Sequence, residues 1–533
     1  MNQAIQVPHR GSGMRPRFFT ALFLLLLPAL LFAEDPIKLE LLSNYQTGVF
    51  DEGAAEIVAY DAGNQRLFFV NSNDVADVLD ISDPPNPTLD CSIDVTLYGD
   101  GANSVAVYGA IVAVAVEADP SQDPGQGVFF DTNGNFLKAV TVGALPDMVT
   151  FTPDGQKVLV ANEGEPDDDY IVDPEGSVSI IDISGGVAAA TAVTADFNAF
   201  DAQKASLTAA GVRIFGPGAT VSQDLEPEYI TVDESSSTAW VTLQENNALA
   251  KVDIASATIT DVLPLGFKDH RLPRNSFDAS NRDDGINIRT WPVLGMYQPD
   301  AIASYTVGGN TYLVTANEGD ARDYDGVSEE ERGDDLNLDP TAFPPSEMYQ
   351  EDENLGRLNS TTTLGDEDGD GDFDKFYAYG ARSFSIWDDD GNLIYDSGNE
   401  MELLTSQILP NDFNSTNDEN DSFDNRSDDK GPEPEGVVVG SFNGRIYAFI
   451  GLERVGGIMV YDVTDPANAC YVTYVNNRDF SVIFDDPTPA ELAQVGDLGP
   501  EGLAFIDGAE SPNGHSLLVV ASEVSGSISI YQL

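Results

Sequence analysis

A pair of β-strands recurs seven times along this 533-residue chain. In each copy an acidic residue, or in one case an asparagine, precedes an apolar strand. The second strand is usually followed by a glutamate. In the third copy Asp147 leads a strand through Phe151, and the next strand runs from Val158 to Glu163. After most pairs comes another strand that ends on Asp or Tyr, such as 178–182. A unit made only of strands, repeated at this period, predicts an all-β fold, a seven-bladed β-propeller with one four-stranded blade per copy.

The repeat also predicts where chemistry gathers, because a propeller brings equivalent positions of its blades together around one axis. The leading residues, one per copy, are Glu56, Asn103, Asp147, Glu228, Asp300, Glu435 and Glu501. The closing residues of the second strands are Asn73, Glu117, Glu163, Glu245, Glu318, Glu453 and Glu523. We therefore expect a ring of carboxylates at one mouth of a central channel.

One domain over residues 36–533 accounts for the chain after its first 33 residues, since no long linker interrupts the copies. The extra length predicts insertions, above all a long acidic insertion at about 320–430. Residues 202–210 are expected to be helical and to end at Gly211. The strand at 39–45 is expected to pair with 527–531, so that the two ends of the domain close the last blade.

The first 33 residues read as a secretory signal peptide. Arg15 and Arg17 precede an apolar run from Phe18 to Ala33, and no acidic residue comes before Glu34. An uncleaved membrane anchor is the alternative, but the run is short for a span. No second hydrophobic span follows, so the remaining chain is expected to be secreted or periplasmic, without a transmembrane segment, and monomeric.

The charge of the chain is strongly negative: 90 acidic and 25 basic residues give a net charge of −65. Such a surface repels nucleic acid and attracts divalent cations and basic partners. Simple solubility in salty surroundings is the alternative explanation. The two cysteines, Cys91 and Cys470, fall in the first and sixth copies. Because those blades are not neighbours in a seven-membered ring, two separate thiols are expected.

One local motif points to calcium. Aspartates alternate in a glycine-rich loop, with Gly371 where an EF-hand loop makes its sharp turn, and such a loop offers the oxygen ligands that Ca²⁺ prefers. Tyr377 stands where a bidentate Glu is usual, so the site is weak or another segment completes it. The alternative is a solvated acidic loop. The predicted ligands are Asp366, Asp368, Asp370, Asp372 and Asp374.

The ring is a second predicted cation site, with Glu228, Asp300, Glu435 and Glu501 as its ligands. Carboxylates so close together repel, and a cation must lie among them. Either a metal ion or a network of arginines would serve. Arg382, Arg454 and Arg478 are the candidate counter-ions.

Two loops with the sequence Asn-Glu-Gly, at Glu163 and Glu318, leave the second strands of the third and fifth copies. Loops at one face of a scaffold often carry sites, and the second loop adds Arg322, which could hold a phosphate or carboxylate. The structural interpretation is that each Glu accepts hydrogen bonds from backbone amides of the next blade.

Familiar catalytic signatures are few. Beyond the signal only His270 and His515 remain, which argues against a His-rich zinc centre. The chain has no Gly-x-Ser-x-Gly elbow. A hydrolytic site could still be built from carboxylates, Ca²⁺ or Mg²⁺, and arginine, and Asp300, Arg322 and Arg454 are the candidate catalytic residues.

Four motifs resemble the choice-of-anchor I family: residues 314–324, 215–220, 265–270 and 430–436. The resemblance implies an exported β-propeller similar to the mesenchyme-specific cell-surface glycoproteins of animals. Family members differ mainly in a C-terminal anchoring device. This chain ends at its last blade, so a freely secreted or periplasmic form is expected. Some relatives carry an alkaline-phosphatase label, but no catalytic residue set transfers to these positions.

Two functions follow. The first is a secreted, acidic β-propeller that binds divalent cations, with Ca²⁺ favoured and Mg²⁺ as the alternative, and acts as a binding module for an extracellular ligand that the sequence does not identify. The second is a metal-dependent alkaline phosphatase or phosphodiesterase with a carboxylate-lined site at the channel mouth. Fold alone does not decide between them.

Overall fold

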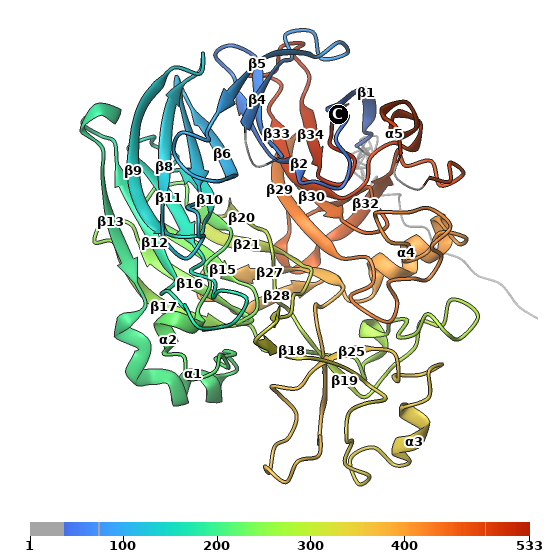
Figure 1. Cartoon of the computed structure of the whole chain (residues 1–533). Helices are drawn as coiled ribbons and strands as arrows, with labels where there is room; N and C mark the ends of the chain where they lie inside the picture. The colour runs from blue at the N-terminus through green and yellow to red at the C-terminus, as the bar shows by residue number, and fades with distance from the viewer. Residues whose placement is uncertain (1–36, 73–74, 485–486) are drawn as a thin grey trace, which may run out of the picture. The chain divides into compact units, whose positions relative to one another are not determined.

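The computed structural model describes residues 37–533, except 73–74 and 485–486. The predicted signal peptide and the closing residue Asn73 lie outside the described residues. The described chain is mostly β, and its main feature is a series of seven four-stranded antiparallel sheets (Figure 1). This arrangement is consistent with the blades of a propeller.

The seven sheets are numbered here by the order of their first strands. Sheet 1 holds β2 (Ala54–Asp61), β3 (Arg66–Asn71), β4 (Val75–Asp80) and β5 (Thr88–Asp94). Sheet 2 holds β6 (Ala102–Tyr108), β7 (Ile111–Val116), β8 (Pro124–Asp131) and β9 (Phe136–Ala144). Sheet 3 holds β10 (Pro146–Phe151), β11 (Lys157–Asn162), β12 (Ser177–Asp182) and β13 (Thr191–Asp196). Sheet 4 holds β14 (Ile230–Val232), β15 (Thr238–Leu243), β16 (Ala248–Asp253) and β17 (Thr258–Pro264).

Sheet 5 holds β20 (Ile302–Val307), β21 (Asn310–Asn317), β27 (Ser383–Asp388) and β28 (Leu393–Asp396). Sheet 6 holds β29 (Pro434–Phe442), β30 (Arg445–Leu452), β31 (Ile458–Asp462) and β32 (Cys470–Val475). Sheet 7 holds β33 (Pro500–Ile506), β34 (Leu517–Ser522), β35 (Ser527–Gln532) and β1 (Glu40–Gln46). The expected closure is confirmed, because β1 pairs with β35 in a register that places Tyr45 opposite Ile528.

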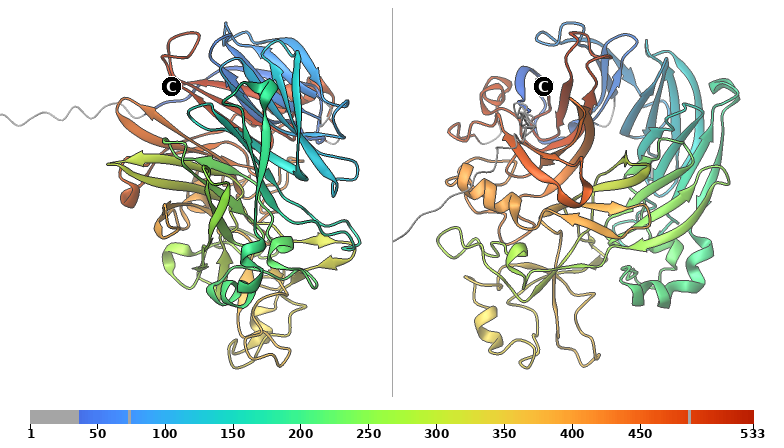
Figure 2. Two further views of the ribbon diagram at one scale, coloured as in Figure 1. Left: turned by 90° about the vertical axis from the view of Figure 1, so that its left-hand side faces the viewer. Right: turned by 180° about the vertical axis from the view of Figure 1, so that it is seen from behind.

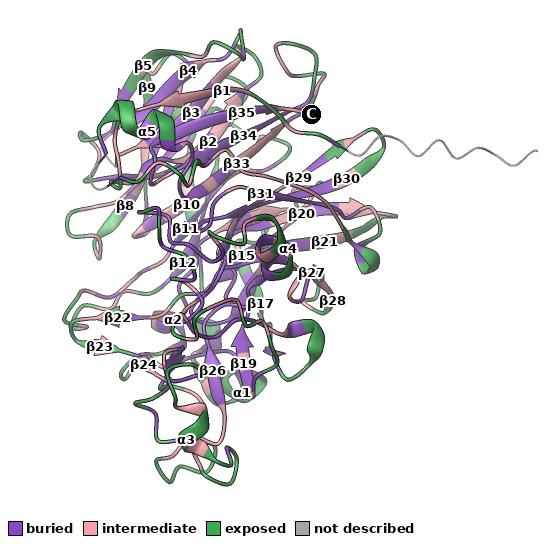
Figure 3. Cartoon of the chain, turned by 90° about the vertical axis from the view of Figure 1, so that its right-hand side faces the viewer, coloured by how far each residue is buried: buried purple, intermediate pink, exposed green. Residues whose placement is uncertain are grey.

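Both faces of the central strands are buried, which explains their continuous apolar sequences. In β7, Val112 and Val114 pack toward sheet 1, while Ala113 and Ala115 pack toward sheet 3. Successive side chains of a strand point to opposite faces, so a strand between two neighbouring sheets must be apolar throughout. Similar cores lie between each sheet and the next, and a core that includes Leu67 and Val519 joins sheet 7 to sheet 1. Figure 3 shows this burial concentrated in the strands.

The first strands of consecutive sheets contact one another. Contacts join β2 to β6, β6 to β10, β10 to β14, β14 to β20, β20 to β29, β29 to β33 and β33 to β2. The first strands thus form a closed circle of neighbours. The leading residues at the start of these strands are therefore brought together, as the repeat predicts.

The insertions form smaller elements. The 3-10 turn η1 (Val187–Ala189) connects β12 to β13 within sheet 3. The 3-10 turn η2 (Asn198–Gln203) and the helices α1 (Lys204–Ala210) and α2 (Val221–Asp224) lie between sheets 3 and 4. The predicted end of α1 is confirmed: Gly211 has a φ of 107°, which glycine adopts without strain.

The other inserted elements are β18 (Phe267–Asp269), η3 (Pro273–Asn275), β19 (Val293–Met296), β22 (Asp323–Tyr324), β23 (Val327–Ser328), β24 (Glu330–Arg332), α3 (Ser346–Tyr349), β25 (Asn359–Thr361), β26 (Phe376–Ala378), α4 (Glu400–Ile408), η4 (Pro466–Asn468) and α5 (Pro489–Val495). In Figures 1 and 2 β19, from the segment between sheets 4 and 5, and α3, from the insertion between β21 and β27, lie away from β2–β5. The two insertions share a core that contains Phe277, Trp291 and Phe376.

Cys91 on β5 and Cys470 on β32 are free thiols. No helix among the described residues is long and apolar enough to cross a membrane.

Candidate cation site

Five of the leading residues occupy irregular positions in their strands. The pairing register of the first strand shifts at Glu56, Asn103, Asp147, Glu435 and Glu501. Such bulges bend a strand and redirect side chains, and they are common next to functional sites. Here they turn the leading side chains out of the ladder at the place where the first strands begin.

Glycines after two of these carboxylates allow the first strands to approach closely. A Cβ at Gly436 would lie 1.8 Å from the carbonyl oxygen of Glu501. A Cβ at Gly502 would lie 2.3 Å from the carbonyl oxygen of Glu56. The glycine of each Glu-Gly sequence in sheets 6 and 7 therefore lets its first strand pack directly against the backbone of the neighbouring sheet.

Substitution of Gly502 by alanine is expected to destabilise the fold. The new methyl would clash with the backbone of Glu56, which cannot rotate away as a side chain can, and we expect a loss of about 3 kcal/mol. Chemical denaturation would measure it. Gly285→Ala is the matched control, because a Cβ at Gly285 has nothing within 4 Å. Equal stability of the two variants would contradict the close approach.

The leading residues open into one cavity of about 270 Å³. Six carboxylate side chains line it, from Glu56, Asp147, Glu163, Glu165, Asp300 and Glu501, together with Asn103 and Tyr229. Tyr229 also lines two neighbouring cavities, whose walls are mainly apolar residues of the first strands. The central space is thus acidic where the first strands begin and apolar further along them.

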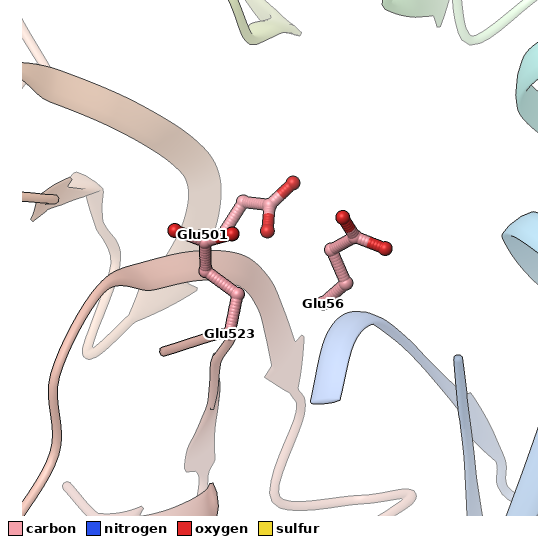
Figure 4. A group of neighbouring side chains, drawn as sticks. All are labelled: Glu56, Glu501 and Glu523. Atoms are coloured by element: carbon pink, nitrogen blue, oxygen red, sulfur yellow. The ribbon is translucent and has the colours of Figure 1, made fainter. Parts of the chain in front are cut away.

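Within this acidic region Glu56, Glu501 and Glu523 form a tight group (Figure 4). One carboxylate oxygen from each lies within 4.8 Å of the others. Glu56 and Glu501 lead sheets 1 and 7, and Glu523 directly follows β34. In the described part of the chain none of the three carboxylates accepts a hydrogen bond or forms an ion pair. One oxygen of Glu501 is buried without a partner.

The electrostatics of this group are unfavourable without a cation. Burial, followed by the charges of Glu523 and Asp147, raises the pKa of Glu56 to about 8. Burial raises the pKa of Glu523 to about 7, with Arg454 opposing the rise. Burial and the charges of Glu56 and Glu523 raise the pKa of Glu501 well above its usual value. At neutral pH the group therefore favours protons or a bound cation.

A second group, Glu318, Glu433 and Glu453, has the same spacing but contains basic side chains. Lys430 Nζ lies 2.7 Å from Glu318 Oε1 and 3.3 Å from Glu433 Oε2. Arg454 Nε lies 3.0 Å from Glu433 Oε2 and 3.1 Å from Glu453 Oε2. Although burial alone would raise the pKa of Glu433, Lys430, Arg426 and Arg454 outweigh it and hold that pKa well below its usual range.

The aspartate loop is arranged differently from the predicted five-ligand shell. Asp366, Asp368 and Asp374 form one group, and Asp372 and Asp374 form another with Asp339, each within 4.8 Å. Asp370 belongs to neither group, and its Oδ1 accepts a hydrogen bond of 3.2 Å from the amide of Asp372. Asp339 comes from another segment, joined to the loop by a bridge between Leu338 and Phe373.

The Asn-Glu-Gly loops owe their structure to the Asn rather than the Glu. The amide nitrogen of Asn162 donates to the hydroxyl groups of Ser177 and Ser179, and its oxygen accepts a hydrogen bond from the backbone of Gly143 in sheet 2. Glu318 accepts hydrogen bonds from Gln244 Nε2 and Lys430 Nζ. The interpretation in which these glutamates accept hydrogen bonds from backbone amides of the next blade is therefore corrected.

Arg322 does not face the cavity. Its guanidinium is buried, with Nη1 2.7 Å from Asp224 Oδ1 and Nη2 2.6 Å from Glu226 Oε2, and it lies over the ring of Phe215. Since these carboxylates already use its charge, Arg322 joins the insertion to the end of α2 and the residues just after it, and is not free to hold a phosphate.

Of the three predicted counter-ions, only Arg454 lies at the ring. Arg382 donates to Glu402 and to the carbonyl groups of Asp278 and Ser427, and Arg478 to Asn420 and to backbone carbonyls. Among the predicted ring ligands, Glu228, Asp300 and Glu435 are not in the tight group with Glu501. Asp300 lines the same cavity, and burial and neighbouring carboxylates raise the pKa of all three well above the usual value.

Sequence reasoning missed four residues: Glu433, Glu523 and Asp339 as members of carboxylate groups, and Lys430 as a counter-ion. Glu523 carried a signal, since it is the closing residue of the last repeat. Lys430 and Glu433 lie in the family motif at 430–436, which does not show where their side chains point, and Asp339 lies in an insertion without a repeat.

One family model matches most of the chain. The model of the choice-of-anchor I domain matches residues 56–466. The chain belongs to the choice-of-anchor I family. The match runs from the leading glutamate of sheet 1 to the end of β31 and just beyond, and so includes six of the seven leading residues.

Two animal proteins are similar to this choice-of-anchor I chain. Gigasin-3a of Magallana gigas is 31% identical over 189 residues, which are 34% of this chain and 66% of that protein. The mesenchyme-specific cell surface glycoprotein of Strongylocentrotus purpuratus is 30% identical over 284 residues, 47% of this chain and 36% of that protein. The chain thus spans just under two thirds of the first relative and about a third of the second. Hydrazine synthase of Kuenenia stuttgartiensis aligns over 92% of this chain and 99% of its own, with a TM-score of 0.45 and 12% identity.

Proposed function

We propose that this choice-of-anchor I protein is a seven-bladed β-propeller that binds a divalent cation at one mouth of its channel and acts as an extracellular binding module. The observation that carries the proposal is the group of Glu56, Glu501 and Glu523. Three converging carboxylates without hydrogen-bond donors or ion pairs in the described chain are costly unless a cation joins them.

Calcium is the cation that this group favours. The ligands are carboxylate oxygens from three different strands, with more carboxylates lining the same cavity. Ca²⁺ accepts six to eight oxygen ligands in flexible geometry, whereas Mg²⁺ demands a compact octahedron and keeps several waters. Magnesium remains the alternative ion.

The aspartate loop is the second part of the proposal. Asp366 accepts hydrogen bonds from the amides of Gly369 and Gly371, so the loop curls around this side chain. Tyr377 stands where an EF-hand loop has its last ligand, a glutamate. Asp339, from another segment, supplies a ligand in its place. We propose a second, solvent-exposed calcium site there.

The extracellular location is supported by the signal-like sequence at residues 1–33 and by the cell-surface description of the sea urchin relative. The strong negative charge also fits an extracellular module that meets divalent cations and basic partners rather than nucleic acid.

The test is calorimetric titration of the chelator-treated protein with Ca²⁺. We expect two classes of site in the wild type. Glu501→Gln should weaken the ring site about tenfold or more, because a neutral amide replaces a charged ligand in a confined group. Asp374→Asn should remove the loop site and leave the ring. Glu510→Gln, the same change at an exposed position, is the matched control. A wild type that takes up no calcium, or a Glu501→Gln variant that titrates like Glu510→Gln, would refute the ring site.

Metal-dependent hydrolysis of phosphate esters is the second candidate, and one observation favours it. Arg454 is partly exposed beside Glu453, so a cationic group does lie at the carboxylate ring. Turnover of a phosphomonoester or phosphodiester that requires Ca²⁺ or Mg²⁺ and is lost in Asp300→Ala would establish the enzyme. Calcium binding without turnover would leave the binding module.

A further inference from the structure

The carboxylate ring contains two groups of the same spacing that are neutralised in different ways. Glu56, Glu501 and Glu523 have no basic partner among the described residues, whereas Glu318, Glu433 and Glu453 surround Lys430 and Arg454. Two members of the second group, Glu318 and Glu453, close the second strands of sheets 5 and 6. Glu523 holds that position in sheet 7. The two groups are therefore related by the repeat.

Lys430 sits in its group much as a metal ion would. Its ammonium lies 2.7 Å from Glu318, 3.3 Å from Glu433 and 3.9 Å from Asp320, and the residue is only 8% exposed. An ammonium is a compact point charge with three donors, so it can satisfy several carboxylates at once. Burial alone would lower its pKa, but Glu318, Glu433 and Asp320 outweigh burial and hold it well above the usual value.

The segment that delivers Lys430 is held in place by buried contacts. Arg382 donates to the carbonyl oxygen of Ser427 at 2.9 Å and to Glu402 Oε1 at 2.6 Å. The next residue, Gly431, has a φ of 73°, and a Cβ there would lie 2.8 Å from Arg382 Nη1. The insertion before β29 thus has a fixed turn that directs Lys430 into the ring.

We propose that Lys430 is a tethered cation that fills the group of Glu318, Glu433 and Glu453 and so confines metal ions to the group of Glu56, Glu501 and Glu523. The inference rests on the proposed function. It adds that Lys430 determines how many metal ions the ring binds. Without the ammonium, Glu318 would lose its ion pair, while Arg426 would still contact Glu433 and Arg454 would still contact Glu433 and Glu453. The surplus negative charge would then call for a cation from solution.

The experiment counts calcium ions by calorimetric titration of full-length protein in the Asp374→Asn background, where only the ring is expected to bind. We expect one ion without further change and two in Lys430→Met, which keeps a similar length and loses the charge. Lys430→Arg keeps the charge and should leave the count at one. A folded Lys430→Met protein that still takes up one ion would overturn the inference. Absence of binding in the background protein itself would instead refute the proposed function.

Lys430→Met could also fail to fold without added cation. The double variant Lys430→Met/Glu318→Gln then distinguishes loss of charge from loss of packing, because it removes one negative charge together with the positive one. We expect it to fold in chelator and to take up one ion. A double variant that still fails to fold would show that Lys430 is needed for packing rather than for its charge, and would overturn the inference.

Discussion

Replacement of Arg322 by alanine is expected to cost about 3–5 kcal/mol of folding stability, the typical result of removing one partner from a buried ion pair. Asp224 and Glu226 would stay buried and lose the cation that both contact. The contact that joins the insertion after β21 to the end of α2 and the residues just after it would be lost with it.

Chemical denaturation at neutral pH measures this loss. Arg271→Ala is the matched control, because Arg271 pairs with Asp269 on the surface, with 65% of its side chain exposed, and such pairs contribute less than about 1 kcal/mol. If Arg322→Ala instead kept wild-type stability and changed only a binding or catalytic property, the assignment of Arg322 to a structural network would be wrong.

Removal of divalent cations is expected to destabilise the protein, and more so as the pH rises. Without a cation, Glu56 and Glu523 hold protons in the folded state up to pKa values of about 8 and 7, against 4.5 as the ordinary value. Between these limits the folded state binds more protons than the unfolded one. Stability is therefore fully present below about pH 4.5 and is lost as the pH rises through 7 to 8.

Calcium reverses this trend because it replaces the protons. At a concentration one hundred times its dissociation constant it adds about 2.7 kcal/mol. In the Asp374→Asn background, which lacks the loop site, melting curves in calcium and in chelator should nearly coincide at pH 5 and separate at pH 8. Glu501→Gln should reduce that separation, whereas Glu510→Gln should not. A separation that is constant with pH would show that the stabilising cations bind elsewhere.

The repeat predicted much of the fold because every sheet has the same sequence pattern. Strands such as β7 are apolar throughout since both faces are buried between neighbouring sheets, and that pattern is visible in the sequence. The pairing of β1 with β35 followed from the need to complete the last sheet. The end of α1 followed from Gly211.

The site was less predictable, because the sequence shows charge but not burial or direction. Arg322 looked available beside an acidic loop, yet its charge is used by Asp224 and Glu226, nearly one hundred residues earlier. Glu501 was expected among the leading residues, but its grouping with Glu523 depends on how the bulge at the start of β33 turns it. Lys430 reaches the ring through a turn that Arg382 fixes, and no repeat marks it.

The pairing of β1 with β35 has a kinetic consequence. Glu40 lies opposite Gln532, so the contact that completes sheet 7 joins nearly the two ends of the described chain. Contacts of such long sequence separation form slowly, since a large loop must close before they stabilise anything. Glu501 and Glu523 belong to this sheet, and Glu56 to the sheet beside it. Completion of sheet 7, which carries Glu501 and Glu523, is therefore expected among the last steps of folding.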